Sequence, residues 1–340
     1  MSSPRYILLK GSTHGLANRL FVLSTAIRLC KSTGAKLLID WNDDTYGVPF
    51  WEAFALEGCG EIISPNQDPT ELNGLRSAQS AWEGQYEATV RNVYKQVSGR
   101  GEYAGIDLQE IPQISGLKTF FEAQQQKDVL VLAGYQKRGQ SPVELLRHFR
   151  LSTTWREKLL DDLHTQSETV RSGAYVGLHI RAAAGNLFPR FQSEQLVRYL
   201  KRHSSLGLFV ATDLLIVEDE LKLLFKERLL PVTRIYASSP NIENDYEPFA
   251  LHRMRALENQ PTGRILYEAV RDLLLLSKSH TIFAQPYSTF SEFACLFSSC
   301  PPWRLHLSGP ATWKYHAGNW LRGVAKYRVN GRCLLGGVTR

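Results

Sequence analysis

The sequence predicts an α/β protein with two facing Rossmann-like domains and mainly parallel sheets. Its 340 residues exceed what one hydrophobic core usually supports, which indicates two domains. Short apolar runs alternate with segments of helical periodicity, a pattern typical of parallel sheets covered by helices. This alternation occurs in two sets separated by a polar segment at residues 167–173 that ends in glycine. In such domains ligands bind at the carboxyl ends of the strands.

The first set predicts an N-terminal domain at residues 1–170. Apolar runs indicate its strands and helical spacing of apolar residues indicates its helices. Strands are expected at residues 6–9, 36–40 and 129–133, and helices at 18–32, 142–149 and 153–170. Glycine and proline residues mark loops through much of 60–125, so this region is expected to be less regular.

The second set predicts another domain at residues 171–310, followed by a basic tail at 311–340. Its expected strands are 174–180, 206–211, 232–236 and 281–284, and its expected helices are 192–203, 216–226, 264–277 and 288–297. No acidic residue follows Glu292, whereas seven Lys and Arg residues do. This tail could contact an anionic surface, and a solvated basic end explains it equally well.

Composition excludes several classes of protein. Hydrophobic residues make up 43% and charged residues 21% of the chain, which is typical of a globular protein. No run of 18 apolar residues predicts a membrane span, and the N-terminus is too short and abrupt for a secretory signal. The five scattered cysteines predict neither a disulfide framework nor a zinc site. A cytoplasmic protein is expected.

The first candidate motif ends the strand at residues 174–180. His179 and Arg181 are two residues apart, so their side chains should point to the same side at the carboxyl edge. An arginine there could present a bidentate fork to a diphosphate. A strand-end ion pair is the alternative. In the second motif, the strand at 206–211 ends similarly in Thr212 and Asp213, and Asp213 could instead cap the following helix. Consecutive βα units usually place their strands side by side, so these two residues should lie beside His179 and Arg181.

The third motif lies between residues 272 and 291. Ser288 and Thr289 are at the predicted N-terminus of a helix, where free N–H groups favour an anion, although Ser288 could be only an N-cap. Asp272 interrupts an apolar helix. Facing a ligand, its two oxygens could accept hydrogen bonds from guanine N1–H and the exocyclic amine. Otherwise it belongs to the exposed face of an amphipathic helix.

The fourth motif is the loop between the first strand and the first helix. Gly15 would let the backbone approach a ligand, and His14, Asn18 and Arg19 would project from the same turn. The loop has neither the dinucleotide fingerprint nor the P-loop pattern. No acidic pair ends a strand of the second domain, so no metal is expected and cationic side chains must neutralise a bound diphosphate.

Taken in order, these motifs resemble the fucosyltransferase superfamily of α1,6- and protein O-fucosyltransferases, and within it nodulation fucosyltransferases of the NodZ type. The likeness runs from residue 5 to about 300 and is patchy between 60 and 130. The matching segments are 15–20, 37–41 with Tyr46, 177–181, which carries the family's HxR motif, 210–213 and 286–290.

The resemblance implies a GT-B architecture and an inverting, metal-independent transfer of fucose from GDP-fucose to a carbohydrate hydroxyl. It implies a catalytic role for Arg181, which would bind the β-phosphate and stabilise its developing charge. It also implies that guanine binds to His179 and Asp272, phosphate to Ser288 and Thr289, and fucose beside Gly15 and Asn18.

The sequence departs from the family after the HxR motif. Alanine at 182 replaces a second basic residue, and Pro189 stands where some α1,6-enzymes have a glutamate base. His14 is the first candidate for the base, because imidazole titrates near neutrality, and Asp43 is the second.

Three alternatives remain at the level of the sequence. The protein could transfer another GDP-linked sugar. It could be a degenerate nucleotide- or glycan-binding protein without activity, as the alanines after Arg181 suggest. A nucleic-acid binder would rest only on the basic tail, and no recognition motif supports specific binding. The acceptor is not identified, and Trp41 and Trp51 could stack on sugar rings or belong to the core.

Overall fold

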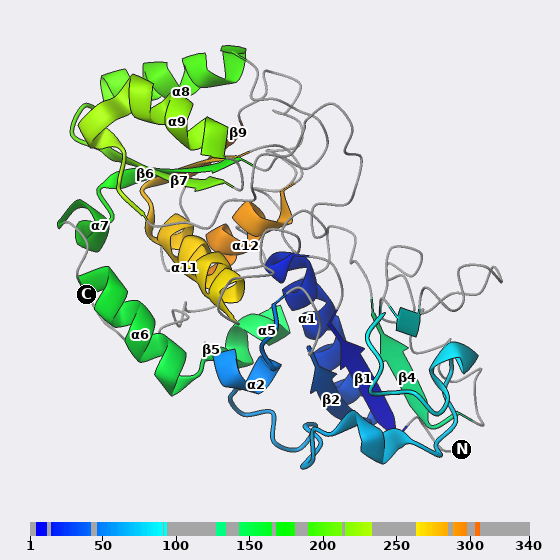
Figure 1. The fold of residues 1–340 in the computed structure, drawn as a ribbon. Coiled ribbons are helices and arrows are strands. Elements are labelled where there is room, and N and C mark those ends of the chain that lie inside the picture. The colour runs from blue at the N-terminus through cyan, green and yellow to red at the C-terminus, as the bar shows by residue number, and fades with distance from the viewer. Residues whose placement is uncertain are drawn as a thin grey trace. The chain divides into compact units, whose positions relative to one another are not determined.

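The structure, a computed structural model, describes the chain in segments (Figure 1). These are residues 5–11, 15–41, 46–90, 92–93, 127–133, 143–164, 168–180, 190–212, 215–232, 263–284, 288–297 and 303–306. The chain divides into two compact units, Met1–Trp155 and Arg156–Arg340. Each unit contains a parallel sheet, so the α/β prediction with mainly parallel sheets is confirmed.

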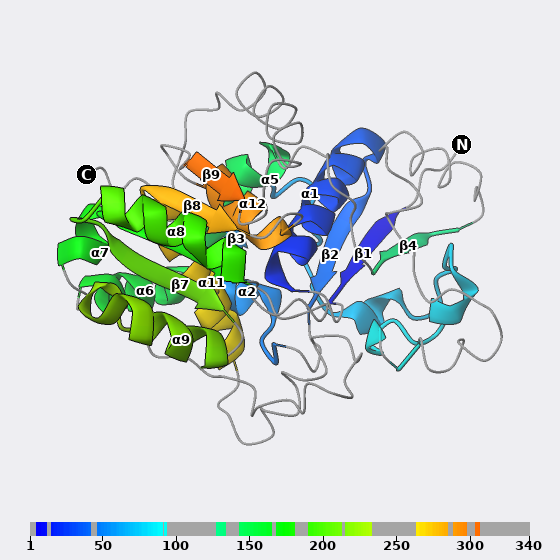
Figure 2. The ribbon, with the colours of Figure 1, turned by 90° about the horizontal axis from the view of Figure 1, so that it is seen from above.

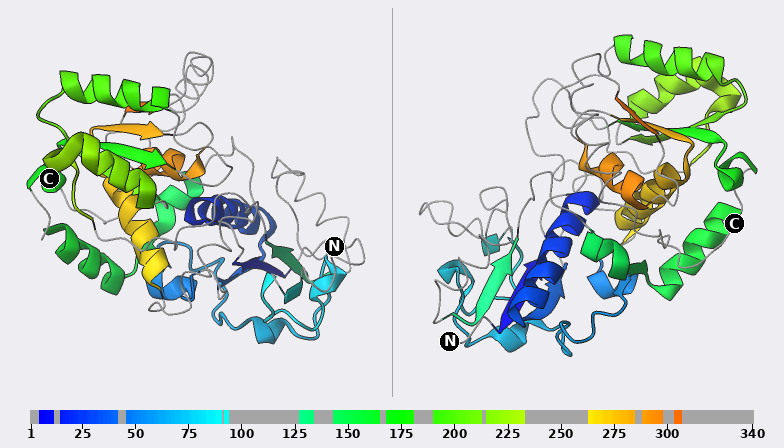
Figure 3. Two further views of the ribbon diagram at one scale, coloured as in Figure 1. Left: turned by 45° about the horizontal axis from the view of Figure 1, so that its top comes forward. Right: turned by 180° about the vertical axis from the view of Figure 1, so that it is seen from behind.

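The first unit is built on a three-stranded parallel sheet in the order β2-β1-β4. Its strands are β1 (Tyr6–Lys10), β2 (Lys36–Asp40) and β4 (Val129–Leu132). Helix α1 (Leu16–Thr33) packs against β1 and β2, and lies alongside the sheet in Figure 3. Alternate strand residues pack instead into a second core around Leu72, Trp82 and Tyr86.

Helix α1 connects β1 to β2 and is buried over most of its length. Every residue from 16 to 27 is buried, so its stability depends on packing against the sheet and α5 (Val143–His148). It ends at Gly34, whose φ of 76° is the left-handed conformation that favours glycine at this position. The chain then enters β2 directly, as the sequence predicts.

A small antiparallel sheet was not predicted. Strand β3 (Phe54–Leu56) pairs with β5 (Phe149–Leu151), and the Phe54 and Phe149 rings are 4.7 Å apart. Both strands have three residues, too few to show a periodic pattern. The remaining short elements of the first unit are α2 (Phe50–Ala53), η1 (Pro69–Leu72) and η2 (Ser80–Trp82).

The second unit has a four-stranded parallel sheet in the order β7-β6-β8-β9. Figure 1 shows α8 and α9 on one side of it and α11 and α12 on the other, and Figure 2 views the same layers from above. The strands are β6 (Tyr175–Ile180), β7 (Gly207–Thr212), β8 (Thr281–Ala284) and β9 (Trp303–His306). The helices that the structure describes after β6 are α8 (Arg190–Arg202), α9 (Leu215–Phe225), η4 (Lys226–Arg228), α11 (Arg264–Lys278) and α12 (Thr289–Phe297).

The two faces of β6 meet different partners. Val176, Leu178 and Ile180 pack in a core with α8 and α9. Gly177 lies on the opposite face, where a Cβ atom would come within 2.8 Å of Ser279 Oγ and 2.9 Å of Leu276 Cδ2. Glycine at this position therefore allows α11 to approach the sheet closely. By alternation, His179 is on the same face as Gly177.

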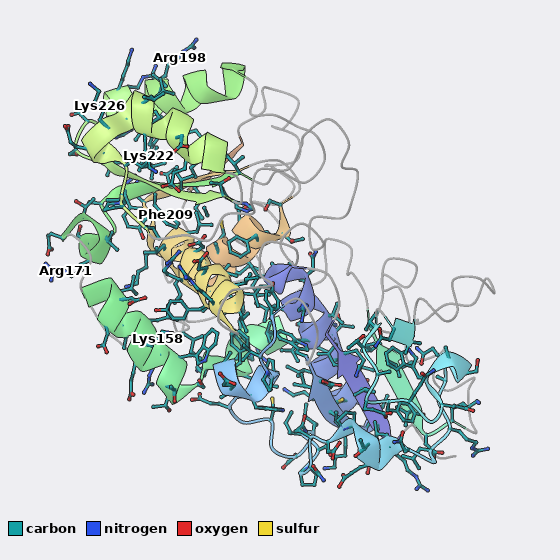
Figure 4. All side chains as sticks on the ribbon, in the orientation of Figure 1. Lys158, Arg171, Arg198, Phe209, Lys222 and Lys226 are labelled. Atoms are coloured by element: carbon teal, nitrogen blue, oxygen red, sulfur yellow. The ribbon has the colours of Figure 1, made fainter. Side chains whose placement is uncertain are left out.

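Two helices before β6 belong to the second unit. In α6 (Thr153–His164), Asp162 accepts a hydrogen bond from Tyr267 on α11. Lys158, labelled in Figure 4, has its Nζ 4.3 Å from the Tyr267 ring centroid. Burial, followed by the contact with Asp162, raises the pKa of Tyr267. These contacts and α7 (Glu168–Ser172) place the predicted junction at 167–173 inside the second unit.

Two of the sequence predictions concern residues outside the described part of the chain, and two others concern membrane spans and cysteines within it. The strand expected at 232–236 and the tail at 311–340 lie largely or wholly outside the described residues. Within the part of the chain that the structure describes, no helix combines the length and the apolar character needed to cross a membrane. Cys30, Cys59 and Cys295 are free thiols, and burial raises the pKa of Cys30.

Candidate functional site

A buried polar contact in the second unit joins the end of β6 to the start of α12. His179 Nδ1 lies 2.8 Å from Ser288 Oγ, and the two residues are 7% and 9% exposed. The imidazole also lies against Phe290, with ring centroids 5.1 Å apart. Ligands of this fold class bind at the carboxyl edge of a parallel sheet, and this buried imidazole lies at that edge.

Ser288 has a second role, as the N-cap of α12. Its Oγ accepts a hydrogen bond from the Ser291 N–H at 3.4 Å, which is the contact expected between a cap and the third helical residue. The sequence left open whether Ser288 caps the helix or faces a ligand. The structure shows that its hydroxyl caps the helix and contacts His179, and that Thr289 beside it is 7% exposed.

Thr212 is near His179 in the sheet but points the other way. β6 and β7 are parallel neighbours, as the sequence predicts, and Thr212 pairs with Ile180. Paired residues point to the same face, and Ile180 packs with the α8 and α9 core. Thr212 is therefore on the opposite face of the sheet from His179, so the two side chains could meet only a ligand that reaches the strand ends.

Asp272 is buried within α11, with 8% of its surface exposed. This excludes the alternative that it belongs to the exposed face of an amphipathic helix. Its Oδ1 lies 3.4 Å from Arg271 Nη2, and α11 packs against α12, β6 and β7. The two oxygens of a carboxylate can accept hydrogen bonds from a ligand.

Sequence reasoning missed a second buried carboxylate on α11. Glu268 precedes Asp272 by one turn, is 9% exposed, and its Oε1 lies 3.7 Å from Arg264 Nε. Arg271 is missed too, and its buried Nε has no hydrogen-bond partner. The sequence shows that Arg264, Glu268, Arg271 and Asp272 recur at helical spacing, but this spacing does not show which of their charges are buried.

In the first unit, Gly15 and Asn18 lie at the start of α1. Gly15 is the N-cap residue without a side-chain cap, and a Cβ atom there would have nothing within 4 Å. Asn18 is 4% exposed, and its Oδ1 is buried without a hydrogen-bond partner. The first turn of α1 therefore combines open space at the backbone with an unsatisfied acceptor.

Arg19 is buried against two aromatic rings. Its guanidinium carbon lies 4.4 Å from the Tyr46 ring centroid and 5.5 Å from that of Trp41, and the residue is 2% exposed. Contact with a ligand stays a prediction for Arg19. The structure adds a positioning role, since this cation–π packing holds both rings against the first turn of α1.

Trp41 belongs to the core, which excludes its stacking on a sugar ring. It is 1% exposed, and the rings of Phe50 and Phe54 meet it edge-on at 4.9 and 5.9 Å. Its Nε1, however, is buried without a hydrogen-bond partner. Trp51 differs, because its Nε1 donates to Gln67 Oε1 at 3.0 Å.

A buried ion pair joins the last residues of β1 and β2. Lys10 Nζ contacts Asp40 and donates to the Tyr86 carbonyl at 2.9 Å, and its side chain is 1% exposed. The ammonium also lies 5.5 Å from the Trp82 ring centroid. The pair therefore places two buried charged side chains at this edge of the sheet.

Four predicted residues lie outside the described part of the chain: the two catalytic candidates Arg181 and His14, the ligand candidate Asp213, and the alternative base Asp43. Among the residues that the structure does describe, no three or more His, Cys, Asp or Glu side chains are grouped in a way that could hold a metal ion.

Comparison of the fold with solved structures finds fucosyltransferases. The fucosyltransferase NodZ from Bradyrhizobium matches with a TM-score of 0.56 and 18% identity, covering 87% of this chain and 93% of NodZ. NodZ α-1,6-fucosyltransferase co-crystallised with GDP matches at 0.53 and 16% over the same shares. POFUT1 without ligand matches at 0.53 and 12%, covering 90% of this chain and 99% of POFUT1. No protein-family model and no curated protein sequence matches the chain.

These likenesses extend over most of both chains in each comparison, so they concern the whole fold and not one domain. At such low identity they establish that the fold resembles that of the NodZ and POFUT1 fucosyltransferases. They agree with the resemblance stated from the sequence motifs, which was reached from different evidence.

Proposed function

We propose that this protein is a glycosyltransferase that moves fucose from GDP-fucose to a carbohydrate hydroxyl, with inversion and without a metal. The observation that carries the proposal is the buried His179–Ser288 contact at the carboxyl edge of the second sheet. It lies where the sequence places a donor site, within a fold shared with NodZ soaked with GDP-fucose and POFUT1 in complex with GDP-fucose.

The second unit supplies the groups proposed to bind GDP. The carboxylate of Asp272 accepts from guanine N1–H and the exocyclic amine, two donors that adenine does not present together. His179 contacts the base, with its ring oriented by Ser288 and Phe290. The N-terminus of α12 at Thr289 and the guanidinium of Arg181 bind the phosphates.

The first unit supplies the groups proposed to meet the fucosyl residue, Gly15 and Asn18. Transfer requires a base that removes the proton of the attacking hydroxyl. His14 is the first candidate and Asp43 the second. As the hydroxyl oxygen attacks the anomeric carbon, the bond to the β-phosphate breaks and GDP leaves with the negative charge.

Two alternatives use the same donor site. Transfer of another GDP-linked sugar would leave every GDP contact in place and change only the contacts to the sugar. A degenerate protein would bind GDP-fucose without turning it over. Hydrolysis and transfer assays with a set of GDP-sugars separate these alternatives.

GDP is expected to raise the melting temperature, whereas UDP, ADP and CMP should do so much less. A ligand that binds only the native state stabilises it by about 2.7 kcal/mol at one hundred times its dissociation constant. Asp272→Asn should reduce the preference for GDP, because an amide NH₂ would face the donors of guanine. Thermal-shift measurements with the four nucleotides test both statements.

The matched control is Asp219→Asn, which removes an exposed carboxylate from α9 in the same unit. This variant should keep the full preference for GDP. Equal shifts from all four nucleotides in the unmodified protein would contradict guanine recognition.

Chelation of divalent metals is expected to leave turnover nearly unchanged. No acidic pair ends a strand of the second unit in the sequence, so the leaving diphosphate must be neutralised by side chains such as Arg181. Initial rates with EDTA, and after addition of Mn²⁺ or Mg²⁺, test this. Activity lost with EDTA and restored by Mn²⁺ would contradict a metal-independent mechanism.

A further inference from the structure

Two unsatisfied polar atoms lie close to the proposed sugar-binding residues of the first unit. Trp41 Nε1 and Asn18 Oδ1 are both buried and neither has a hydrogen-bond partner. Most buried polar groups in native proteins are hydrogen-bonded, so each exception needs an explanation. One of these atoms is a donor and the other is an acceptor.

Both atoms belong to the same part of the fold. Asn18 is in the first turn of α1 and directly precedes Arg19, whose guanidinium packs over the Trp41 ring at 5.5 Å. Trp41 directly follows β2, at the carboxyl edge of the sheet. Both residues thus lie at the carboxyl edge of the sheet, as does Gly15, where a Cβ atom would have nothing within 4 Å.

Packing leaves Trp41 one way to take part in binding. Phe50, Phe54 and Arg19 cover the indole ring, and only 1% of the residue is exposed. Such a ring cannot stack on a sugar. Its N–H can still donate a hydrogen bond in the plane of the ring, and in this protein that donor is unused.

The chemistry of the two atoms selects a class of ligand. The ionised diphosphate of a nucleotide sugar has no O–H group and only accepts hydrogen bonds, so it would leave Asn18 Oδ1 unsatisfied. A hydroxyl group donates one hydrogen bond and accepts others, so a sugar can satisfy both the indole N–H and the amide oxygen. A buried water has the same capability and is the competing occupant.

We infer that Trp41 is a specificity-determining residue whose indole N–H donates to a hydroxyl of the bound fucosyl residue, while Asn18 Oδ1 accepts from a sugar hydroxyl. This inference rests on the proposed function. It assigns to Trp41 the selection of the sugar and gives it no part in binding the nucleotide.

The test compares Trp41→Phe with Trp51→Phe by calorimetric titration with GDP and with GDP-fucose. Trp41→Phe removes the unused N–H and should weaken GDP-fucose about 3- to 10-fold, the value of one net hydrogen bond. Its affinity for GDP should not change. Trp51→Phe makes the same substitution at an indole already bonded to Gln67, and should change neither affinity.

A second measurement uses the protein without substitutions. With ¹⁵N-labelled tryptophan, the Trp41 indole N–H signal should shift and exchange more slowly with GDP-fucose than with GDP. The other indole signals serve as internal controls. This readout stays valid if Trp41→Phe fails to fold.

The outcomes separate the two proposals. If GDP binds but Trp41→Phe leaves GDP-fucose affinity unchanged, or weakens GDP equally, the role of Trp41 is wrong and the proposed function stands. A Trp41 indole signal that responds identically to GDP and GDP-fucose is the result expected for a buried water, and also overturns the role. If neither compound binds the unmodified protein, the proposed function fails, and the inference fails with it.

Discussion

Replacing Arg181 with alanine is expected to lower turnover about 10²- to 10³-fold, the usual effect of removing one preorganised group that stabilises charge in a transition state. In the proposed reaction, negative charge grows on the β-phosphate as GDP leaves. Without a metal, the guanidinium of Arg181, which directly follows β6 in the sequence, is proposed as the main stabiliser of that charge. Steady-state kinetics with GDP-fucose and an acceptor would measure the loss.

Arg181→Lys separates charge from geometry. It keeps the cation but loses the bidentate fork, so it should also be strongly impaired while the melting temperature stays close to that of the unmodified protein. Arg171→Ala is the control, because this exposed arginine of α7, labelled in Figure 4, pairs only with the exposed Glu168 in the described contacts. A folded and fully active Arg181→Ala would contradict the phosphate role, and an unfolded one would indicate a structural ion pair.

Lys10→Met is expected to destabilise the first unit by about 3–5 kcal/mol. The substitution removes the ammonium partner of the buried Asp40 carboxylate, and breaking a buried ion pair in this way carries a cost of this size. The Tyr86 carbonyl would also lose a donor. Urea denaturation followed by tryptophan fluorescence would measure the loss of stability.

Lys127→Met is the matched control in the same unit. Lys127 pairs with Glu83 at 3.0 Å, but their side chains are 30% and 40% exposed, so the loss should be about 0–1 kcal/mol. The double variant of Lys10→Met with Asp40→Asn should be destabilised by less than the sum of the two single variants. Full additivity would show that the two groups are not coupled.

Much of the architecture could be predicted because helix and strand periodicity is a local property. The apolar alternation of β6 and β7 and the long buried run of α1 are visible in the sequence, and the motifs at their ends follow from the same reading. The adjacency of β6 and β7 was also expected, since consecutive βα units usually lie side by side. The β3–β5 pairing was not, because two three-residue strands separated by a long insertion show no local pattern.

The sequence by itself determined the order of most of the described elements in both units, although not β3, β5 or β9, and placed His179 and Ser288 at the ends of their elements. Tertiary structure alone decided that these two side chains lie 2.8 Å apart, that Thr212 is on the opposite face, and that Asp272 is buried. The physical reason is the same in each case. The burial and partners of a polar atom depend on surfaces that distant segments bring to it, and periodicity carries no information about those surfaces. The unused N–H of Trp41 is of this kind, since Arg19, Phe50 and Phe54 close around its ring and none of them accepts a hydrogen bond from it.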